Sequence, residues 1–397
     1  MNILYLAHRI PYPPHTGDKV RSFHQIRHLA RNHRISLACF VDDRSDLEHV
    51  ATLGRWCASV DVVYRSRRAA QVAGLRGLWT GRSLAVAAFQ SGALEGKLKE
   101  RCGEPFDAIV AFTAVMAPYG DRARAAARIV DFVDVDSEKW RLYAQRVPGP
   151  ASWIYRLEAG RLHAFEIATA RAWDHSLFVS EREAGYVRPY VTDRPVSILS
   201  NGVDLEFFAP GPPGANHRAS EIIFTGAMDY FPNVDAVVHF SDAILPRIQA
   251  QMPSARFAII GRNPTRDVRR LASRRGVSVT GTVPDIRDHM RGALVSVVPL
   301  RIARGVQNKM LESMAMGIPV VSTSDAFRGL GASRAAGVDV VDDPAAFADT
   351  VTRLLRDEPL RRARGAEARA YVERHHRWEH HGEKLEALLE TIVRARR

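Results

Sequence analysis

Three cations and one carboxylate lie close together in residues 301–317. Arg301, Arg304 and Lys309 supply the positive charges, and Glu312 supplies the negative charge. Arginine and lysine side chains bind phosphate oxygens through charge-assisted hydrogen bonds. Positive charge beside a departing diphosphate also stabilises the charge that develops on it. These residue types and their spacing therefore predict a site for a diphosphate-bearing ligand, with Glu312 available to accept hydroxyl groups.

The sequence around these residues predicts a strand, a loop and a short helix. Residues 293–299 form a buried apolar run, Gly305 lies in the loop, and Asn308 is a good N-cap for a helix over 309–316. Gly317 fits the left-handed residue that commonly ends a helix. Unpaired N–H groups and the dipole at the start of such a helix favour an anion. The alternative is an ordinary strand–loop–helix unit, in which Glu312 complements the dipole from the first turn.

Short apolar runs alternate with helical patterns along the whole chain. Strands are expected at residues 2–7, 35–41, 60–64, 108–112, 129–133, 176–179 and 196–199, and then at 221–225, 256–260, 277–280, 295–299, 319–322 and 338–341. Helices are expected at residues 19–31, 234–249, 345–356 and, in the tail, 367–397. Such alternation predicts an α/β fold with doubly wound parallel sheets. The densest group of proline and glycine, residues 210–214, separates the two sets of strands.

Composition narrows the class of protein. The apolar runs of the 397 residues fall short of the roughly 20 residues that span a bilayer. The apolar start lacks the basic flank of a signal peptide. Three widely spaced cysteines, Cys39, Cys57 and Cys102, form no disulfide framework. We therefore expect a cytoplasmic protein. The net charge of +12 favours anionic partners, although a GC-rich genome also produces such a charge; nucleic acid is not expected, because no nucleic-acid-binding motif is present.

Several segments resemble the family 4 glycosyltransferases. Residues 309–323 closely resemble the family's LEAMA-x-G-x-PVV-x-T segment, and residues 201–204 with Phe208 and Pro210 resemble its NGVD…F-P hinge. Further matches, in chain order, are Ser180-Glu181, Gly226, Gly261 and residues 279–283. The resemblance covers nearly the whole chain. Residues 8–19 and 226–233 also look like the branch of sugar transferases linked to exopolysaccharide and PEP-CTERM/exosortase gene clusters.

The resemblance implies the GT-B fold, in which two Rossmann-like domains face each other across a cleft. Residues 1–200 would form the acceptor-side domain, completed by a C-terminal helix at 377–397. Residues 201–376 would bind the nucleotide sugar. The implied activity is transfer of a sugar from a nucleotide-diphosphate sugar to a glycan or lipid-linked acceptor in exopolysaccharide synthesis, with retained configuration and without a metal or other cofactor. The alternatives are a nucleotide-sugar epimerase of the same fold and a catalytically degenerate module that binds sugar nucleotides.

The resemblance also implies roles for single residues. Glu312 would hold the donor ribose, and the three cations would lie beside the diphosphate. Gly17 would let the first loop approach the donor. The remaining donor-site candidates are Gly226, Val283, Gly305 and Asn308.

Two positions depart from the family's pattern. Where the family often carries the first of two glutamates, eight residues before Glu312, this chain has Arg304, and residues 226–233 lack the family's basic pair. We hypothesise that Arg304 replaces the lost positive charge.

A second candidate site follows the apolar run 129–133. Related enzymes often place a histidine near the transferred sugar at the position of Val133 or Asp134, and this chain offers Asp134 and Asp136 there instead. They would orient the acceptor hydroxyl or act as a base, since closed sites can raise a carboxyl pKa. The alternative is an acidic cap on a helix that starts near Glu138. Asp134 and Asp136 also spell a DxD metal motif, but three residues are a weak pattern, and we expect no metal.

Two regions mix cations with aromatic residues. No acidic residue occurs between Asp61 and Glu95, where Arg65, Arg82 and Trp79 lie, and residues 139–173 carry Trp140, Trp153 and several arginines. Such surfaces rest on anionic leaflets. Peripheral contact with the inner face of the cytoplasmic membrane is one interpretation, and packing of ordinary amphipathic helices is the other. Histidines at 375, 376, 380 and 381 have no ligand set that completes a tetrahedral metal site.

Overall fold

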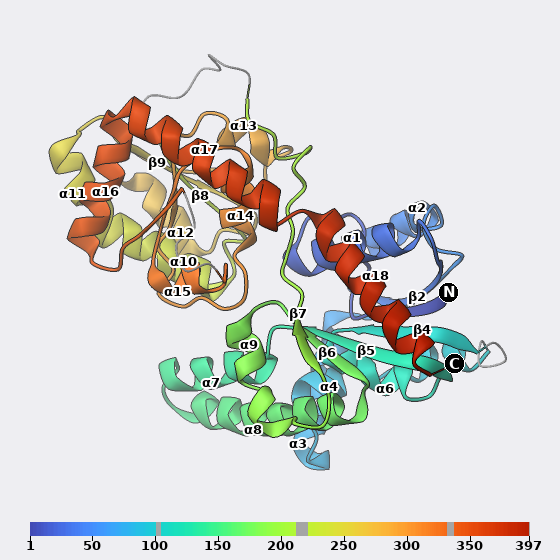
Figure 1. The fold of residues 1–397 in the computed structure, drawn as a ribbon. Coiled ribbons are helices and arrows are strands. Elements are labelled where there is room, and N and C mark those ends of the chain that lie inside the picture. Colours follow the sequence, from blue (N-terminus) through green and yellow to red (C-terminus); the bar gives the residue numbers. More distant parts are fainter. Residues whose placement is uncertain (101–104, 212–220, 332–336, 397) are drawn as a thin grey trace. The chain divides into compact units, whose positions relative to one another are not determined.

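The computed structural model describes all residues except 101–104, 212–220, 332–336 and 397, and the side chains at 67, 75, 76, 78 and 146 are also outside the description. Cys102 and residues 212–214 of the proline and glycine cluster therefore lie outside the described residues. The chain forms two compact units (Figure 1). Unit 1 contains Met1–Ser200 and Glu379–Arg397, and unit 2 contains Asn201–Trp378.

Unit 1 is built on a parallel sheet. The described strands are β1 (Asn2–Ala7), β2 (Arg34–Val41), β3 (Ser59–Tyr64), β4 (Phe106–Phe112), β5 (Ala125–Val133), β6 (His175–Phe178) and β7 (Val196–Ile198), in the order β3-β2-β1-β4-β5-β6-β7. Strand β1 lies between β2 and β4, with Tyr5 opposite both Leu37 and Val110. Leu4 and Leu6 join one hydrophobic cluster and Tyr5 joins the cluster on the other face. Because strand side chains alternate between faces, a continuous apolar run suits a sheet covered on both sides.

The helices of unit 1 cover the two faces of this sheet (Figure 1). They are α1 (Gly17–Leu29), α2 (Val50–Leu53), α3 (Arg67–Thr80), α4 (Leu84–Ala88), α5 (Gly92–Glu100), α6 (Ala117–Gly120), α7 (Asp136–Arg146), α8 (Pro150–Ala172), α9 (Glu181–Gly185) and most of α18 (Trp378–Arg394). Helix α18 places Leu385, Leu389 and Val393 in the same cluster as Ile26 and Leu29. The last helix of the chain is therefore part of the core that the first helix covers.

Unit 2 repeats the parallel architecture. Its described strands are β8 (Glu221–Thr225), β9 (Arg256–Ile260), β10 (Val277–Val279), β11 (Val295–Val298), β12 (Val320–Ser322) and β13 (Val338–Val340), in the order β10-β9-β8-β11-β12-β13. Its helices are α10 (Phe231–His239), α11 (Leu245–Gln251), α12 (Arg266–Arg270), α13 (Ile286–Met290), α14 (Asn308–Ala315), α15 (Ser324–Arg328), α16 (Pro344–Arg356) and α17 (Glu358–His375). Both sheets confirm the predicted doubly wound parallel α/β class.

Two predicted helices are interrupted. The expected helix over 234–249 consists of α10, a π-helical turn Phe240–Ile244 and α11. Pro246 lacks the N–H that would continue an α-helix, so the ladder changes at that point. The tail, expected to be helical over 367–397, contains two helices: α17 ends at His375 and α18 begins at Trp378.

The break at His376 has a packing cause. His376 Nδ1 lies 2.9 Å from the Asn201 carbonyl oxygen, and Val203 pairs with Arg377 in an isolated bridge. A Cβ atom on Gly202 would lie 2.8 Å from the backbone nitrogen of Trp378. The segment that opens unit 2 therefore contacts the segment that closes it, and a continuous helix would not fit beside it.

A buried ion pair connects helix α1 to strand β5. Arg21 and Asp131 are 1% and 0% exposed, and Arg21 Nε lies 2.8 Å from Asp131 Oδ2. Gln25 donates to the same carboxylate at 2.7 Å, and Tyr5 donates to Gln25. Arg21 also donates to the Ser200 carbonyl at 3.0 Å. Burial, followed by the charge of Asp131, raises the pKa of Tyr5 well above its usual value. The network therefore connects α1 with β1, β5 and Ser200.

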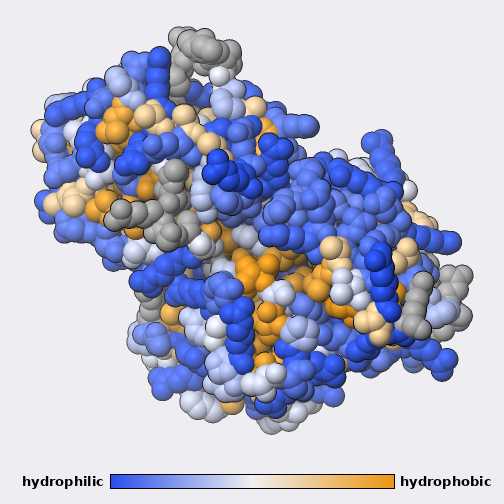
Figure 2. Space-filling view, viewed as in Figure 1, coloured by the Kyte–Doolittle hydropathy of each residue, from blue (hydrophilic) through white to orange (hydrophobic). Residues whose placement is uncertain are grey.

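In the part of the chain that is described, every helix is too short or too polar to cross a bilayer. On the face drawn in Figure 2 hydrophilic side chains dominate, and hydrophobic ones gather in smaller patches.

We predict that Arg21→Met destabilises the protein by about 3–5 kcal/mol, because it leaves Asp131 buried and uncompensated. Urea unfolding followed by circular dichroism measures this change. The double variant Arg21→Met/Asp131→Asn should recover part of the loss, since it removes the unpaired charge. Arg31→Met, at an exposed position just after the same helix, is the matched control. Equal stabilities of Arg21→Met and Arg31→Met would contradict the assignment.

Candidate functional site

Helix α14 follows β11 and the loop 299–307, as the sequence predicted. It begins one residue earlier than expected: Asn308 is its first helical residue and Gln307 occupies the N-cap position. The prediction of Asn308 as the N-cap was therefore wrong. Its side-chain oxygen instead accepts a hydrogen bond from the Asn201 amide at 2.9 Å, while the Gln307 amide donates to the Arg304 carbonyl at 2.8 Å. Gly317 has the predicted left-handed backbone, with φ 68°.

Lys309, in the first turn of α14, lies in an enclosed polar position. Its Nζ donates to Asn233 Oδ1 at 2.6 Å and stands 4.6 Å from the centre of the Phe224 ring. Phe224 belongs to β8 and Asn233 to α10, so three elements meet at this amine. Burial, which disfavours the charged form, lowers the Lys309 pKa to about 8. A lysine in this setting gains more from an arriving anion than a solvated lysine does.

Two glycines make room for this arrangement. Gly226 and Gly261 end β8 and β9 with φ values of 156° and 157°. A Cβ atom on Gly261 would lie 1.6 Å from the Gly226 carbonyl oxygen, and one on Gly226 would lie 2.7 Å from the Asn233 amide nitrogen. Because only glycine fits such close approach at positive φ, the strand ends leave space for the side chains of Asn233 and Lys309.

Glu312 lies three residues after Lys309 on the same helix. The structure places it in the second turn of α14, which corrects the prediction that it falls in the first turn. The helix begins in a loop of basic and amide residues, so complementing the dipole from the first turn does not explain this carboxylate. Burial raises the Glu312 pKa to about 7, and the charge of Lys309 offsets part of that rise. A carboxylate and an amine whose pKa values approach each other near neutral pH are typical of functional sites.

Arg301, Arg304 and Gly305 lie in the loop before α14. Arg301 Nε donates to Asp235 Oδ2 at 3.0 Å on α10, and this hydrogen bond raises the Arg301 pKa. Asp235 therefore balances the charge of Arg301. Arg304 is half-buried. Gly305, with φ 57°, packs closely enough that a Cβ atom on Gly329 would reach its carbonyl oxygen at 1.7 Å.

The other predicted donor-site residues, Val283 and Gly17, lie on other elements of the chain. Val283 lies in the loop after β10 and packs against a small apolar cluster that includes Ile223, Ile260 and Met290. Gly17 is an exposed residue at the start of α1 in unit 1.

Asp134 and Asp136 lie at the carboxyl end of β5 in unit 1. The acidic-cap alternative is wrong, because α7 begins at Asp136 after Val135, which makes no side-chain cap within the described residues. The N–H groups there are bound by other carboxylates. Val135 donates to Glu183 at 2.8 Å, and the Ser137 N–H and hydroxyl donate to Glu166. Neither aspartate occupies the N-cap position, which is Val135. Asp134 is half-buried and Asp136 is exposed.

The first loop of unit 1 carries another polar group. His8 Nε2 and Arg9 Nη1 lie 3.4 Å and 2.8 Å from Asp18 Oδ2, and Thr16 donates to the other oxygen. Burial alone would raise the Asp18 pKa, but the hydrogen bonds and charges of His8 and Arg9 hold it well below the usual range. His8, which directly follows β1, therefore contacts the carboxylate of Asp18, next to Gly17.

Sequence reasoning missed Asn233, Phe224 and Asn201 as members of the site. Each lies next to a segment that was singled out: Asn233 and Phe224 flank Gly226, and Asn201 opens the predicted hinge. An amide residue a few positions after a strand-ending glycine is the signal that would have drawn attention to Asn233.

Comparison with known proteins identifies the domain that carries this site. Residues 219–357 match the family model described as glycosyl transferases group 1. The chain is 31% identical over 185 residues to a phosphatidyl-myo-inositol mannosyltransferase of Mycolicibacterium smegmatis. This match covers 45% of this chain and 47% of that protein. The chain thus spans about half the length of the curated relatives it matches. Unit 2 therefore contains a group 1 glycosyltransferase domain.

Solved structures share the fold of the whole chain. Sucrose-phosphate synthase from Thermosynechococcus elongatus superposes with a TM-score of 0.73 at 16% identity, covering 100% of both chains. HepE from Anabaena, in complex with UDP-glucose, gives a TM-score of 0.69 at 13% identity, covering 98% of this chain and 100% of that one. These matches confirm the predicted GT-B fold.

We predict that Glu312→Gln stabilises the protein increasingly as the pH rises. The carboxyl has an ordinary pKa of 4.5 and a folded value of about 7. The folded state holds this proton more tightly than the unfolded chain, so its stability falls as the pH rises between these values. Glutamine cannot ionise. The difference in unfolding free energy should therefore grow from near zero at about pH 3.5, below the ordinary pKa, to about 1–3 kcal/mol at about pH 8.

Thermal and urea unfolding across this pH range measure the effect. Glu206→Gln, at an exposed position of the same unit, is the control and should change little. A Glu312→Gln effect that is independent of pH would show that burial does not shift this carboxyl.

Proposed function

We propose that the protein transfers a sugar from a nucleotide-diphosphate sugar to an acceptor hydroxyl. The observation that carries the proposal is the enclosed Lys309 amine, held by Asn233 above the Phe224 ring at the start of α14 and three residues from Glu312. The group 1 glycosyltransferase match over residues 219–357 supports it. So does the sugar nucleotide bound in the HepE structure of the same fold.

In this proposal, the diphosphate lies at the start of α14. Lys309 and the N–H groups of the first turn would bind its oxygens, and Glu312 would accept hydroxyl groups of the ribose. The diphosphate would raise the Lys309 pKa, because an anion favours the charged amine. When the bond between the anomeric carbon and the diphosphate oxygen breaks, these groups stabilise the negative charge that the leaving group acquires.

The loop cations would have unequal parts in this site. Asp235 already balances Arg301, so Arg301 would contribute mainly by holding the loop against α10. Arg304 is half-buried, and it stands where the family often has a glutamate. We propose that Arg304 contacts the diphosphate or the transferred sugar. Gly305 and Gly226 would let the ligand approach the protein backbone closely. Val283 would lie beside the donor base, and Gly17 of unit 1 would approach the donor.

On the acceptor side, Asp134 and Asp136 would orient the acceptor hydroxyl or take its proton. The Val135 and Ser137 N–H groups at the start of α7 donate to Glu183 and Glu166, so these two N–H groups are not bound by the aspartates. We propose retention of the anomeric configuration and catalysis without a metal, since cations of the chain would neutralise the diphosphate. A glycan or lipid-linked acceptor of exopolysaccharide synthesis, in the branch linked to PEP-CTERM/exosortase clusters, is the proposed context.

We further propose that unit 1 contacts the inner face of the cytoplasmic membrane. Trp79 on α3 and Trp153 on α8 are 92% and 65% exposed, and Arg161 of α8 donates to the Gly77 carbonyl of α3. Arg68 near the start of α3 and Arg82 just after its end are also exposed. Exposed tryptophan with nearby cations favours an anionic interface.

Other members of these aromatic regions pack inward. Arg65 pairs with Asp42 at 2.9 Å and lies over the Phe89 ring, and Trp140 packs against Tyr155. The packing interpretation holds for these residues, and the membrane proposal rests on the two exposed tryptophans.

We predict that Lys309→Met raises the KM or Kd for the donor about 10–100-fold, the effect of losing a charged hydrogen bond of about 1.5–3 kcal/mol. Arg304→Ala should weaken the donor in the same direction. Thermal-shift screening against UDP-, GDP- and CMP-sugars identifies the donor first, since a ligand of the native state stabilises it. Transfer and hydrolysis assays with that donor then give the kinetic constants.

Lys97→Met, at an exposed position of unit 1, is the control for losing a lysine. Donor affinity that is unchanged by Lys309→Met would sink the proposed site. Binding without transfer to any acceptor would favour the degenerate module, and interconversion of two sugar nucleotides would favour the epimerase.

For the membrane, we predict that the protein sediments with vesicles containing anionic lipid at low salt and is released at high salt, because screening weakens charge attraction. Trp79→Ser/Trp153→Ser should reduce the bound fraction several-fold. Phe207→Ser, an exposed aromatic residue of unit 2, is the control. Salt-independent or absent sedimentation of the unaltered protein would contradict membrane contact.

A further inference from the structure

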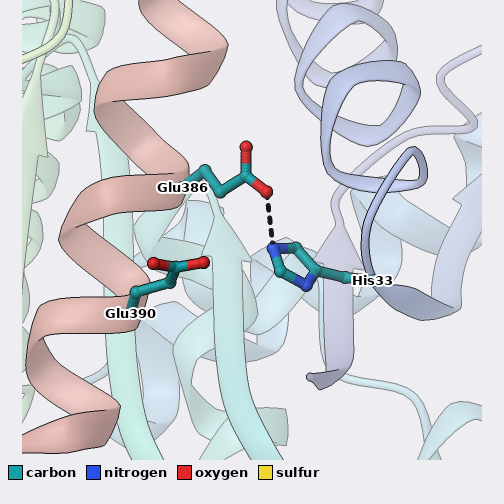
Figure 3. Close-up of side chains that lie close together, drawn as sticks. All are labelled: His33, Glu386 and Glu390. Carbon is teal, nitrogen blue, oxygen red and sulfur yellow. Dashed lines mark ion pairs between the residues drawn. The ribbon is translucent and has the colours of Figure 1, made fainter.

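A histidine and two glutamates meet where α18 packs beside the end of α1. His33 follows α1, and Glu386 and Glu390 are four residues apart on α18, so both carboxylates lie on one face of that helix (Figure 3). His33 Nε2 lies 2.9 Å from Glu386 Oε1. One ligand atom from each of the three residues falls within 4.8 Å of the others. All three residues belong to unit 1.

The His33 ring nitrogen that faces α18 is buried without a matching hydrogen bond. The side chain is 5% exposed, and Nε2 has no hydrogen-bond partner among the described residues although Glu386 is near. The other ring nitrogen, Nδ1, lies 3.2 Å from the Met1 nitrogen. A buried nitrogen that is close to a carboxylate but out of line with it suits coordination of a shared ion better than a direct hydrogen bond.

Neighbouring groups hold Glu386 in place. The Asn32 amide donates to Oε1 at 2.9 Å, and His28 Nε2 lies 2.9 Å from Oε2. Burial alone would raise the Glu386 pKa, but these contacts lower it, so the group is a carboxylate at neutral pH. Gly382 packs directly on the His28 ring: a Cβ atom there would lie 2.4 Å from His28 Nδ1. Metal-binding carboxylates are commonly oriented by such outer contacts.

Glu390 provides the second carboxylate. Its side chain is partly exposed and accepts from Arg394 at 2.9 Å. An exposed pair of this kind contributes little, so an ion can compete for the carboxylate. Two carboxylates four residues apart on a helix repel each other. A divalent cation between them would remove that repulsion.

We propose that His33, Glu386 and Glu390 bind a divalent transition-metal ion, Zn²⁺ being the best match. One imidazole and two carboxylates are ligands that Zn²⁺ accepts, with water completing a tetrahedral set. Zinc–ligand distances of about 2.0–2.2 Å would bring the three ligand atoms closer together than the present limit of 4.8 Å. The ion would connect α18 to the turn between α1 and β2. This site is separate from the proposed sugar-transfer site and does not depend on it.

The test uses the full-length chain without a polyhistidine tag. The protein is stripped with EDTA, dialysed against metal-free buffer, incubated with a small excess of Zn²⁺ and dialysed again. Elemental analysis should find one Zn²⁺ per chain, and Zn²⁺ should raise the Tm. Glu390→Gln and His33→Gln should each weaken Zn²⁺ binding at least about 10-fold, since even outer contacts carry 10–100-fold effects. Circular dichroism of the metal-free variants checks that they are folded.

His380→Gln and Glu383→Gln are matched controls, because both residues are exposed on the same helix. They should retain the unaltered affinity and the Tm increase. Loss of Zn²⁺ binding in Glu390→Gln and His33→Gln alone supports the site. Failure of the unaltered protein to retain Zn²⁺ would overturn it. So would equal retention by the two ligand variants, or loss in the control variants, because the ion would then bind elsewhere.

Discussion

The candidate site depends on one half-buried amine at the start of α14. Lys309 lies above the Phe224 ring and is held by a single amide, Asn233. That position exists because Gly226 and Gly261 bring two strand ends closer than any side chain would allow. Keeping a lysine there costs stability, as its lowered pKa shows. Burial also disfavours the charged form of the nearby Glu312, and its pKa is raised rather than lowered. Such costs are usual where a charged ligand later supplies the missing interactions.

Buried carboxylates organise unit 1 in a comparable way. Asp131 anchors Arg21, Glu183 and Glu166 bind the N–H groups at the start of α7, and Glu158 accepts from Ser83 and the N–H groups that open α4. Each carboxylate joins elements distant in the sequence. Charge is thus used inside this unit to fix helices relative to strands. These buried carboxylates thus position the residues at the carboxyl ends of the strands.

Prediction from the sequence succeeded where local pattern decides structure. Strands β8 and β9 have the predicted ends, because apolar runs bounded by breakers leave little choice. Gly317 has the expected positive φ for the same local reason. The start of α14 and the turn that carries Glu312 were misplaced, because Asn201, more than a hundred residues earlier, binds the Asn308 side chain that was expected to cap the helix. The break at His376 arises from a similar distant contact with the opening of unit 2.

By itself, the sequence determined the parallel α/β class, the positions of most strands along the chain and the clustering of cations before a short helix, since these follow from hydrophobic period and turn chemistry. Only the tertiary structure decided which cation is compensated, because Asp235 lies 66 residues before Arg301 in the chain. It also decided that Lys309 meets Asn233 and that His33 meets α18. Side-chain partners from distant segments, and the burial that sets their charge, are properties of packing, which local sequence does not encode.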